Sequence, residues 1–308
     1  MAERGDGTDG GGSERDTCAA RSRGEGESAL GTASRARRWL LVEQPGAWGS
    51  DALASSGLPT VVADRLRALA RSLPARVLLI RRTRRTPPDG PRSVYVGWSG
   101  LEGRWLEHLV LPDLAELLTL DLAPLGDGRS VGGTPVRTPL YLVCTNGRHD
   151  PCCAEYGRPV ASALEQLVGQ RVWECSHVGG DRFAGNLVCL PDGHFYGHLD
   201  PSSALRVVTA HEQGQVVLDH WRGRSTLPFV VQAAEGYVRA AIGLAGRDDV
   251  RFRGSRRDGD RHRVRFGLST GGEVVAVVGV SERRVPEGLT CAGTGRITPS
   301  FELVALER

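Results

Sequence analysis

The chain has 308 residues, a hydrophobic fraction of 40% and a formal net charge of +3. This length suits one large domain or two ordinary ones, and no stretch approaches the roughly 20 apolar residues that span a membrane. No apolar leader precedes the first ordered segment, so we expect a cytoplasmic protein with reduced thiols. All basic residues are Arg, and Asp258 and Asp260 interrupt the most basic run. We therefore expect neither nucleic acid nor membrane as a partner.

Residues 1–36 are rich in Gly, Ser, Glu, Asp and Arg and contain almost no large apolar side chain. Such a segment buries too little surface to offset the entropy of ordering, so we predict a disordered tail in which Cys18 has no role. Order is predicted to begin at Trp39, with a short apolar run that ends before Pro45.

Residues 37–135 are predicted to form a first unit with the element order β-α-β-β-β-α. Apolar alternation indicates the strands, and leucines at helical spacing indicate the first helix. The elements are expected at residues 39–43, 64–73, 77–80, 94–98, 105–111 and 112–118.

Residues 136–225 follow a similar order. Strands are expected at 140–143, 171–174, 183–190 and 194–199, and helices at 154–167 and 201–212. A strand, a crossover helix, a parallel strand, a hairpin and a covering helix form a thioredoxin-like core. We therefore predict an α/β fold with tandem thioredoxin-like units, followed at residues 226–308 by a small α+β appendage.

Five of the seven cysteines lie within residues 144–189, on short apolar runs and the turns between them. Thiolates and imidazoles gathered in one window are typical of zinc and iron–sulfur sites. Cys144 ends the first strand of the second unit. Cys152 and Cys153 begin the next helix, whose partial positive charge favours thiolates.

His177 and Asp181 follow the next predicted strand, on a turn that contains two glycines. Because ligand sites form at the carboxyl ends of neighbouring parallel strands, we expect both side chains to lie near Cys144 and Cys153. Arg182 and Asn186 either brace this glycine turn or serve local hydrogen bonding, and the sequence does not distinguish the two.

The remaining thiols and imidazoles have plainer interpretations. Cys189 lies in an alternating strand and is predicted to be a small buried hydrophobe. Cys175 is interpreted as structural before it is interpreted as a ligand, and Cys291 as a bystander in a Gly/Thr loop. Cys152 stays open, because adjacent cysteines cannot easily face one iron. Surface positions are expected for His149, His194 and His198.

This window resembles the sucrase/ferredoxin-like family, a branch of the thioredoxin-like 2Fe–2S ferredoxins. The resemblance rests on four features and extends over roughly residues 39–227. They are Cys144, the Gly-Arg-x-Asp stretch ending at Asp150, the Cys-Ala-Glu that begins at Cys153, and the run from His177 to Asn186. The apolar start at Trp39 is also similar.

The resemblance implies a cluster held by two Cys and two His. The matching positions here are Cys144, Cys153, His177 and Asp181, so an aspartate stands where the second histidine is expected. Carboxylate is a hard ligand for such an iron, and Cys175, Cys152 or water are the alternatives for the fourth position.

The function that the resemblance implies is 2Fe–2S electron transfer with an unidentified reductase or acceptor protein, an electron carrier more than an enzyme. Two alternatives remain open. One is thiol–disulfide exchange with Cys152 or Cys153 as nucleophile, against which the missing C-x-x-C motif counts. The other is a structural zinc site built from the same residues. Nothing in the sequence supports sucrose hydrolysis.

Overall fold

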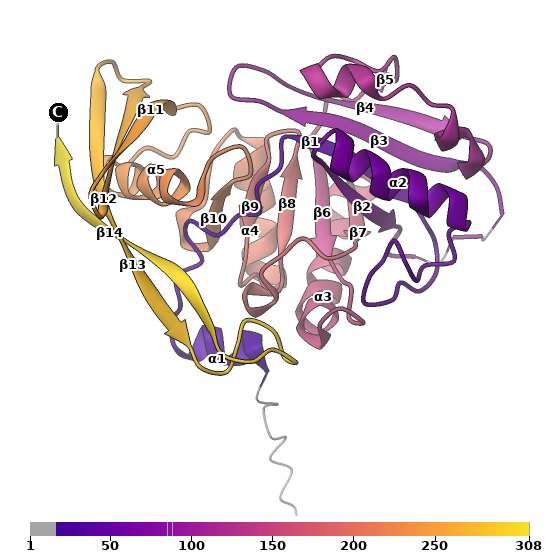
Figure 1. Ribbon diagram of the computed structural model, residues 1–308, viewed down its shortest axis with the longest axis horizontal. Coiled ribbons are helices and arrows are strands. Elements are labelled where there is room, and N and C mark those ends of the chain that lie inside the picture. The colour runs from indigo at the N-terminus through magenta and orange to yellow at the C-terminus, as the bar shows by residue number, and fades with distance from the viewer. Residues whose placement is uncertain (1–16, 85, 88, 308) are drawn as a thin grey trace, which may run out of the picture.

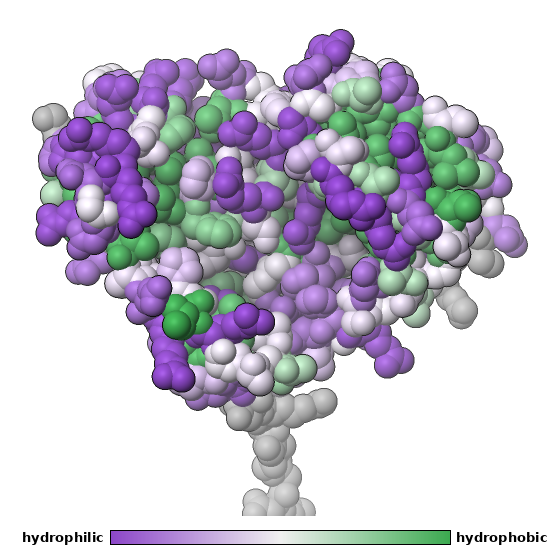
Figure 2. All heavy atoms as spheres, viewed as in Figure 1, coloured by the Kyte–Doolittle hydropathy of each residue, from purple (hydrophilic) through white to green (hydrophobic). Residues whose placement is uncertain are grey.

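The computed structural model describes residues 17–84, 86–87 and 89–307 (Figure 1). It is a mixed α/β structure with one ten-stranded sheet and one four-stranded sheet, so the predicted α/β class is confirmed. Hydrophilic side chains surround apolar patches on the face seen in Figure 2. Within the described ranges, no helix combines the length and the apolarity that crossing a bilayer requires.

The first half of the large sheet has the strand order β2-β1-β3-β4. Its strands are β1 (Arg38–Glu43), β2 (Ala75–Arg81), β3 (Arg92–Ser99) and β4 (Arg104–Leu111), with the short β5 (Thr134–Pro135) beyond β4. β1 is parallel to β2 and antiparallel to β3. Helix α2 (Thr60–Ser72) connects β1 to β2, and the predicted second helix is the 3-10 turn η1 (Leu114–Leu118), followed by η2 (Ala123–Asp127).

The second half repeats this arrangement as β7-β6-β8-β9. Its strands are β6 (Leu140–Cys144), β7 (Val172–Cys175), β8 (Leu187–Leu190) and β9 (His194–Tyr196), and β10 (Trp221–Arg224) extends the edge. Helix α3 (Pro151–Val168) crosses from β6 to the parallel β7, and α4 (Pro201–Glu212) packs against α3. The short turns η3 (Gly169–Arg171), η4 (Asp181–Phe183) and η5 (Leu218–His220) lie in the connections.

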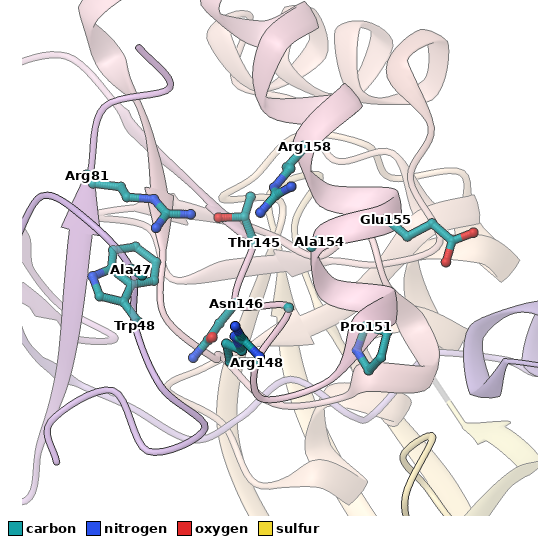
Figure 3. A pocket seen from close by; sticks show the side chains of 11 residues that line it. Ala47, Trp48, Arg81, Thr145, Asn146, Arg148, Pro151, Ala154, Glu155 and Arg158 are labelled. Atoms are coloured by element: carbon teal, nitrogen blue, oxygen red, sulfur yellow. The ribbon is translucent and has the colours of Figure 1, made fainter. Parts of the chain in front are cut away.

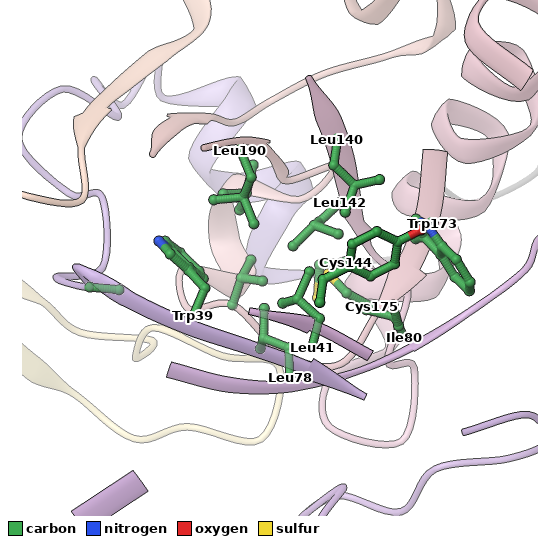
Figure 4. Packing of buried hydrophobic residues seen from close by; sticks show 14 of the residues in the cluster. Trp39, Leu41, Leu78, Ile80, Leu140, Leu142, Cys144, Trp173, Cys175 and Leu190 are labelled. Carbon is green, nitrogen blue, oxygen red and sulfur yellow. The ribbon is translucent and has the colours of Figure 1, made fainter. Parts of the chain in front are cut away.

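An antiparallel pairing between β2 and β7 joins the two halves into one sheet, with Ile80 opposite Cys175. One hydrophobic cluster spans both halves (Figure 4). It contains Trp39, Leu41 and Leu78 from the first half and Leu140, Leu142 and Trp173 from the second. Burying each such side chain contributes about 1.5–3 kcal/mol, so the two halves stabilise each other through this shared cluster. The boundary between two units at residues 135 and 136 stays a prediction.

The segment before β1 is folded. Helix α1 (Cys18–Gly24) begins after Thr17, whose hydroxyl accepts a hydrogen bond from Ala20 N, and Cys18 is buried. Ala33 is also buried, in the cluster that spans the large sheet. The tail predicted over residues 1–36 is therefore wrong for residues 17–36, and residues 1–16 lie outside the described residues. A seven-residue helix is too short to show periodicity, and its buried contacts come from distant segments.

The C-terminal part consists of α5 (Phe229–Ile242) packed on an antiparallel four-stranded sheet. The strands lie in chain order and are β11 (Val250–Asp258), β12 (Arg261–Leu268), β13 (Glu273–Val285) and β14 (Arg296–Glu307). The described residues of this part thus contain one helix and four strands, of which β13 and β14 are the longest. Their hairpin extends beyond the small sheet to α1, and its tip loop, residues 286–295, carries Cys291 (Figure 1).

A buried aspartate connects the C-terminal part to the large sheet. Asp192, in the predicted turn between β8 and β9, lies 2.6 Å from Arg104, 2.5 Å from Arg247 and 3.0 Å from His211. Burial opposes its ionisation, but the contact with His211 and the two guanidinium charges outweigh burial and lower the pKa of Asp192 below its ordinary value.

Replacing Asp192 by Asn is expected to lower the free energy of unfolding by about 2 kcal/mol near neutral pH, because both arginines lose a charged partner. The folded pKa lies below the unfolded one, so this stability is present above the unfolded pKa, about 4, and is lost as the pH falls through the folded pKa. Urea unfolding near pH 7 and near pH 3 should show the gap between variant and wild type narrowing in acid. The exposed Asp258→Asn is the control, and an equal gap at both pH values would contradict the assignment.

Candidate metal centre

The predicted ligands come from the carboxyl ends of the parallel strands β6 and β7. Cys144 is the last residue of β6, Cys153 lies in the first turn of α3, and His177 follows β7. The two Sγ atoms and a ring nitrogen of His177 all lie within 4.8 Å of one another. All three side chains are buried or half-buried, as expected for a metal site shielded from water.

Asp181 lies against the same residues. Its Oδ1 atom is 3.2 Å from Cys153 Sγ and 3.1 Å from His177 Nδ1. The His177 nitrogen is buried, and it makes no well-oriented hydrogen bond within the described parts of the chain. A buried nitrogen that faces thiols and a carboxylate without such a bond is suited to a metal ion.

A second histidine joins this group. The ring of His149 stacks on that of His177 with centroids 3.7 Å apart, and its Nε2 lies 3.8 Å from Asp181 Oδ2. Ligand atoms of His149, His177 and Asp181 again fit within 4.8 Å of one another. His149 is exposed, as the sequence predicted, but it is also a fifth candidate ligand that the sequence analysis missed. Its position four residues before Cys153 is the sequence feature that could have indicated a ligand here.

The charges in the group favour a thiolate at Cys144. The contacts of Cys144 with Cys153 and with His177 lower its pKa well below the ordinary value although burial opposes this, and the contact between the two thiols raises the pKa of Cys153. Burial disfavours the charged form of His177, but its contacts with Asp181 and Cys144 outweigh burial and raise its pKa to about 9.

Helix α3 positions the two adjacent cysteines. Asp150 is its N-cap and accepts a hydrogen bond from the backbone N–H of Cys152 at 2.9 Å. Gly157, one turn further along the helix, lies against the end of β6, where a Cβ would come within 2.1 Å of the Cys144 carbonyl oxygen. A glycine is required here for α3 to bring Cys153 next to Cys144.

A buried arginine braces the turn between His177 and Asp181. Arg222, on β10, donates hydrogen bonds to the Gly179 carbonyl at 2.8 Å and to Asn186 Oδ1 at 2.6 Å, and Asn186 donates to the Gly180 carbonyl at 2.8 Å. The bracing role considered for Asn186 is therefore observed. Burial lowers the pKa of Arg222 to about 9, so it remains a cation near neutral pH, close to the thiolate and carboxylate.

The sucrase/ferredoxin-like family matches the chain over residues 29–223. This chain belongs to the sucrase/ferredoxin-like family. The matched region contains Cys144, Cys153, His177 and Asp181 and ends within β10, so the C-terminal part lies outside it. No curated protein and no solved structure matches the chain significantly.

The other cysteines of this sucrase/ferredoxin-like chain have distinct surroundings. Cys175 lies beside Cys144 in strand register, but it belongs to none of the groups of ligand atoms found among the described residues. Cys189 is a buried core residue of β8, as predicted. Cys152 faces away from Cys153, with its Sγ 3.6 Å from Cys18 Sγ and 3.3 Å from Cys291 Sγ.

Cys18 and Cys291, which were expected to have no role, lie next to each other and to Cys152. The two residues are 273 positions apart, and no local pattern indicates that they meet. His194 was expected at the surface but is buried on β9, where it accepts a hydrogen bond from Trp221.

A pocket of about 520 Å³ opens beside the loop that connects Cys144 to α3 (Figure 3). Three arginines line it, namely Arg81, Arg148 and Arg158, together with the acid Glu155. Arg81 is neutralised by Glu174 at 2.8 Å and lies over the ring of Trp48. Arg148 and Arg158 are exposed, so the surface next to the ligand group is positively charged.

Proposed function

We propose that this sucrase/ferredoxin-like protein binds a 2Fe–2S cluster and transfers electrons. The observation that carries the proposal is the convergence of Cys144, Cys153 and His177, with ligand atoms within 4.8 Å. Two thiolates and an imidazole form a donor set suited to iron in such clusters. Membership of a family described as ferredoxin-like supports the same cofactor.

The topology of the large sheet supports the fold that accompanies this function. We propose that residues 37–135 and 136–225 are tandem thioredoxin-like units. In each half the first two strands along the chain pair in parallel, and the next two strands form an antiparallel hairpin. Each half thus has its second strand, first strand, third strand and fourth strand in that order across the sheet. Residues 226–308 are the appendage.

The described residues would hold the cluster in two pairs. Cys144 and Cys153 would bind one iron, and His177 and Asp181 the other. When bound, the cluster supplies reversible one-electron chemistry. The histidine side is the accessible one, since the side chain of His177 is 22% exposed whereas Cys144 and Cys153 are buried. Electrons would therefore enter and leave through the imidazole side.

We propose a redox partner protein with an acidic docking surface. Arg148 and Arg158 are exposed beside the loop that carries the ligands, and their charges are suited to steering an acidic partner to this face. The partner is a reductase or an acceptor, and its identity is independent of the cluster assignment.

Thiol–disulfide exchange is less well supported by the structure. Cys152 and Cys153 are both fully buried, and they face different groups of side chains. A nucleophilic thiol must reach the disulfide of another protein, so burial counts against this role.

The experiment that tests the proposal is metal analysis of the full chain purified without oxygen. We expect about two irons and two acid-labile sulfides per chain and a red-brown absorption spectrum, with one of the irons held by Cys144 and Cys153. A colourless protein that carries zinc at these residues, or one without metal there, would overturn the cluster assignment.

A further prediction concerns the fourth ligand. Asp181→Ala is expected to lose most of the iron, because Asp181 contacts both Cys153 and His177. His149→Ala is expected to keep it, since His149 is exposed and its contacts in this group are with His177 and Asp181, whereas Asp181 also contacts Cys153. The iron content and the visible absorption of both variants show which residue is the fourth ligand. The reverse pattern would assign the fourth position to His149, and iron retained in both would direct attention to Cys175.

A further inference from the structure

Three cysteines from distant parts of the chain meet at a second place on α3. Cys18 lies at the start of α1, Cys152 in the first turn of α3, and Cys291 in the tip loop of the β13–β14 hairpin. Their Sγ atoms form a triangle with sides of 3.6, 3.3 and 3.5 Å. Cys18 and Cys152 are buried and Cys291 is exposed, and all three thiols are free.

The dimensions of this triangle suit a mononuclear metal. A disulfide places its two sulfurs about 2.05 Å apart and leaves a third thiol unused. A tetrahedral zinc with Zn–S bonds of about 2.3 Å separates its sulfur ligands by about 3.8 Å, close to the distances found here. An iron–sulfur cluster that takes one thiolate per iron holds its ligands further apart.

A buried carboxylate completes the group. Asp150 is 1% exposed, and its Oδ2 lies 3.8 Å from Cys18 Sγ. Its two oxygens accept hydrogen bonds from the backbone N–H groups of Cys152 and Cys291, at 2.9 and 2.7 Å. It forms no salt bridge with any residue that the structure describes. One ligand atom from each of the four residues falls within 4.8 Å of the others, and a dication would offset two of the four negative charges that three thiolates and a carboxylate carry.

We propose that Cys18, Cys152, Cys291 and Asp150 form a structural zinc site, separate from the candidate cluster site. Three thiolates and one carboxylate are a closed tetrahedral set with no position left for substrate. The adjacent Cys152 and Cys153 thus serve two different sites from one helix turn. The zinc site does not depend on the presence of an iron–sulfur cluster.

The position of the zinc site explains why α1 and the hairpin tip are held against the ferredoxin-like half. It connects three segments separated by more than 130 residues. Because these ligands meet only in the folded chain, metal binding stabilises the folded state. Ion pairs point to the same junction. Glu27, just after α1, contacts Arg182 next to Asp181 at 2.9 Å and Arg283 on β13 at 2.8 Å.

The test is metal analysis of the full chain, with zinc and iron measured on the same sample. We expect about one zinc per wild-type chain and its loss in Cys18→Ser and in Cys291→Ser. Zinc is expected to remain in Cys144→Ser, a ligand of the other site, and in Cys189→Ser, a buried core thiol that belongs to neither group of ligand atoms among the described residues. Cys291 is exposed on a loop, so its replacement is not expected to prevent folding.

Cobalt(II) bound to the zinc-depleted wild-type chain provides an independent readout. Tetrahedral thiolate coordination should give strong thiolate-to-cobalt bands that are absent in Cys291→Ser and present in Cys189→Ser. Three results would each overturn the proposal. These are wild-type chain without zinc, zinc retained in both Cys18→Ser and Cys291→Ser, and a disulfide between two of these cysteines in the anaerobically purified protein.

Discussion

Cys153→Ser is expected to remove the iron and the visible absorption of the purified protein, whereas Cys152→Ser is expected to leave both. The two residues are neighbours at the start of α3, and both are fully buried. Only Cys153 has its sulfur next to Cys144 and Asp181, since Cys152 faces Cys18 and Cys291. Serine is a poor ligand for iron, so iron should fall from about two per chain to near zero in the first variant alone.

The same pair of variants gives a matched comparison for the second site. Zinc is expected to show the opposite pattern, with loss in Cys152→Ser and retention in Cys153→Ser. Because the two substitutions are chemically identical and one residue apart, a general effect on folding would lower both metals in both variants. Iron that survives in Cys153→Ser would contradict the assignment of this residue to the cluster.

The sequence predicts this arrangement where the relevant contacts are local. Cys144, Cys153 and His177 are each fixed by the strand end or helix start beside them, and parallel strands bring such ends together. The three cysteines of the second site share no element or neighbouring loop. Cys18 lies in a segment with the composition of a disordered tail, and Cys291 in a Gly/Thr loop, so only the tertiary structure brings them to Cys152.

The fold likewise divides into elements that the local sequence predicts and contacts between distant segments that it does not. Strands such as β1 and β6 follow from runs of apolar residues, and α4 spans the residues predicted for it, Pro201–Glu212. The pairing of β2 with β7, which makes one sheet from two halves, rests on only two residue pairs. The alternation of apolar residues along a strand does not indicate which other strand pairs with it. It also does not indicate that the β13–β14 hairpin reaches α1.

The second large effect is expected in the reduction potential of His177→Cys. The variant keeps a ligand atom at this position, so about two irons per chain should remain. A thiolate carries one more negative charge than a neutral imidazole, and this charge stabilises the oxidised cluster. All-cysteine plant-type clusters lie near −400 mV and clusters with two histidines at roughly −150 to +300 mV.

One histidine should therefore account for about 100 mV or more, and the potential of His177→Cys is expected to fall by that amount. Voltammetry of the wild type and the variant at one fixed pH measures the shift, with His262→Ala, on the distant β12, as the control. Arg222, a buried cation bonded to the same turn, is present in both proteins and cancels from the difference. An unchanged potential with iron retained would remove His177 from the ligand set and leave His149 as the imidazole to test, since its ring is stacked directly on that of His177.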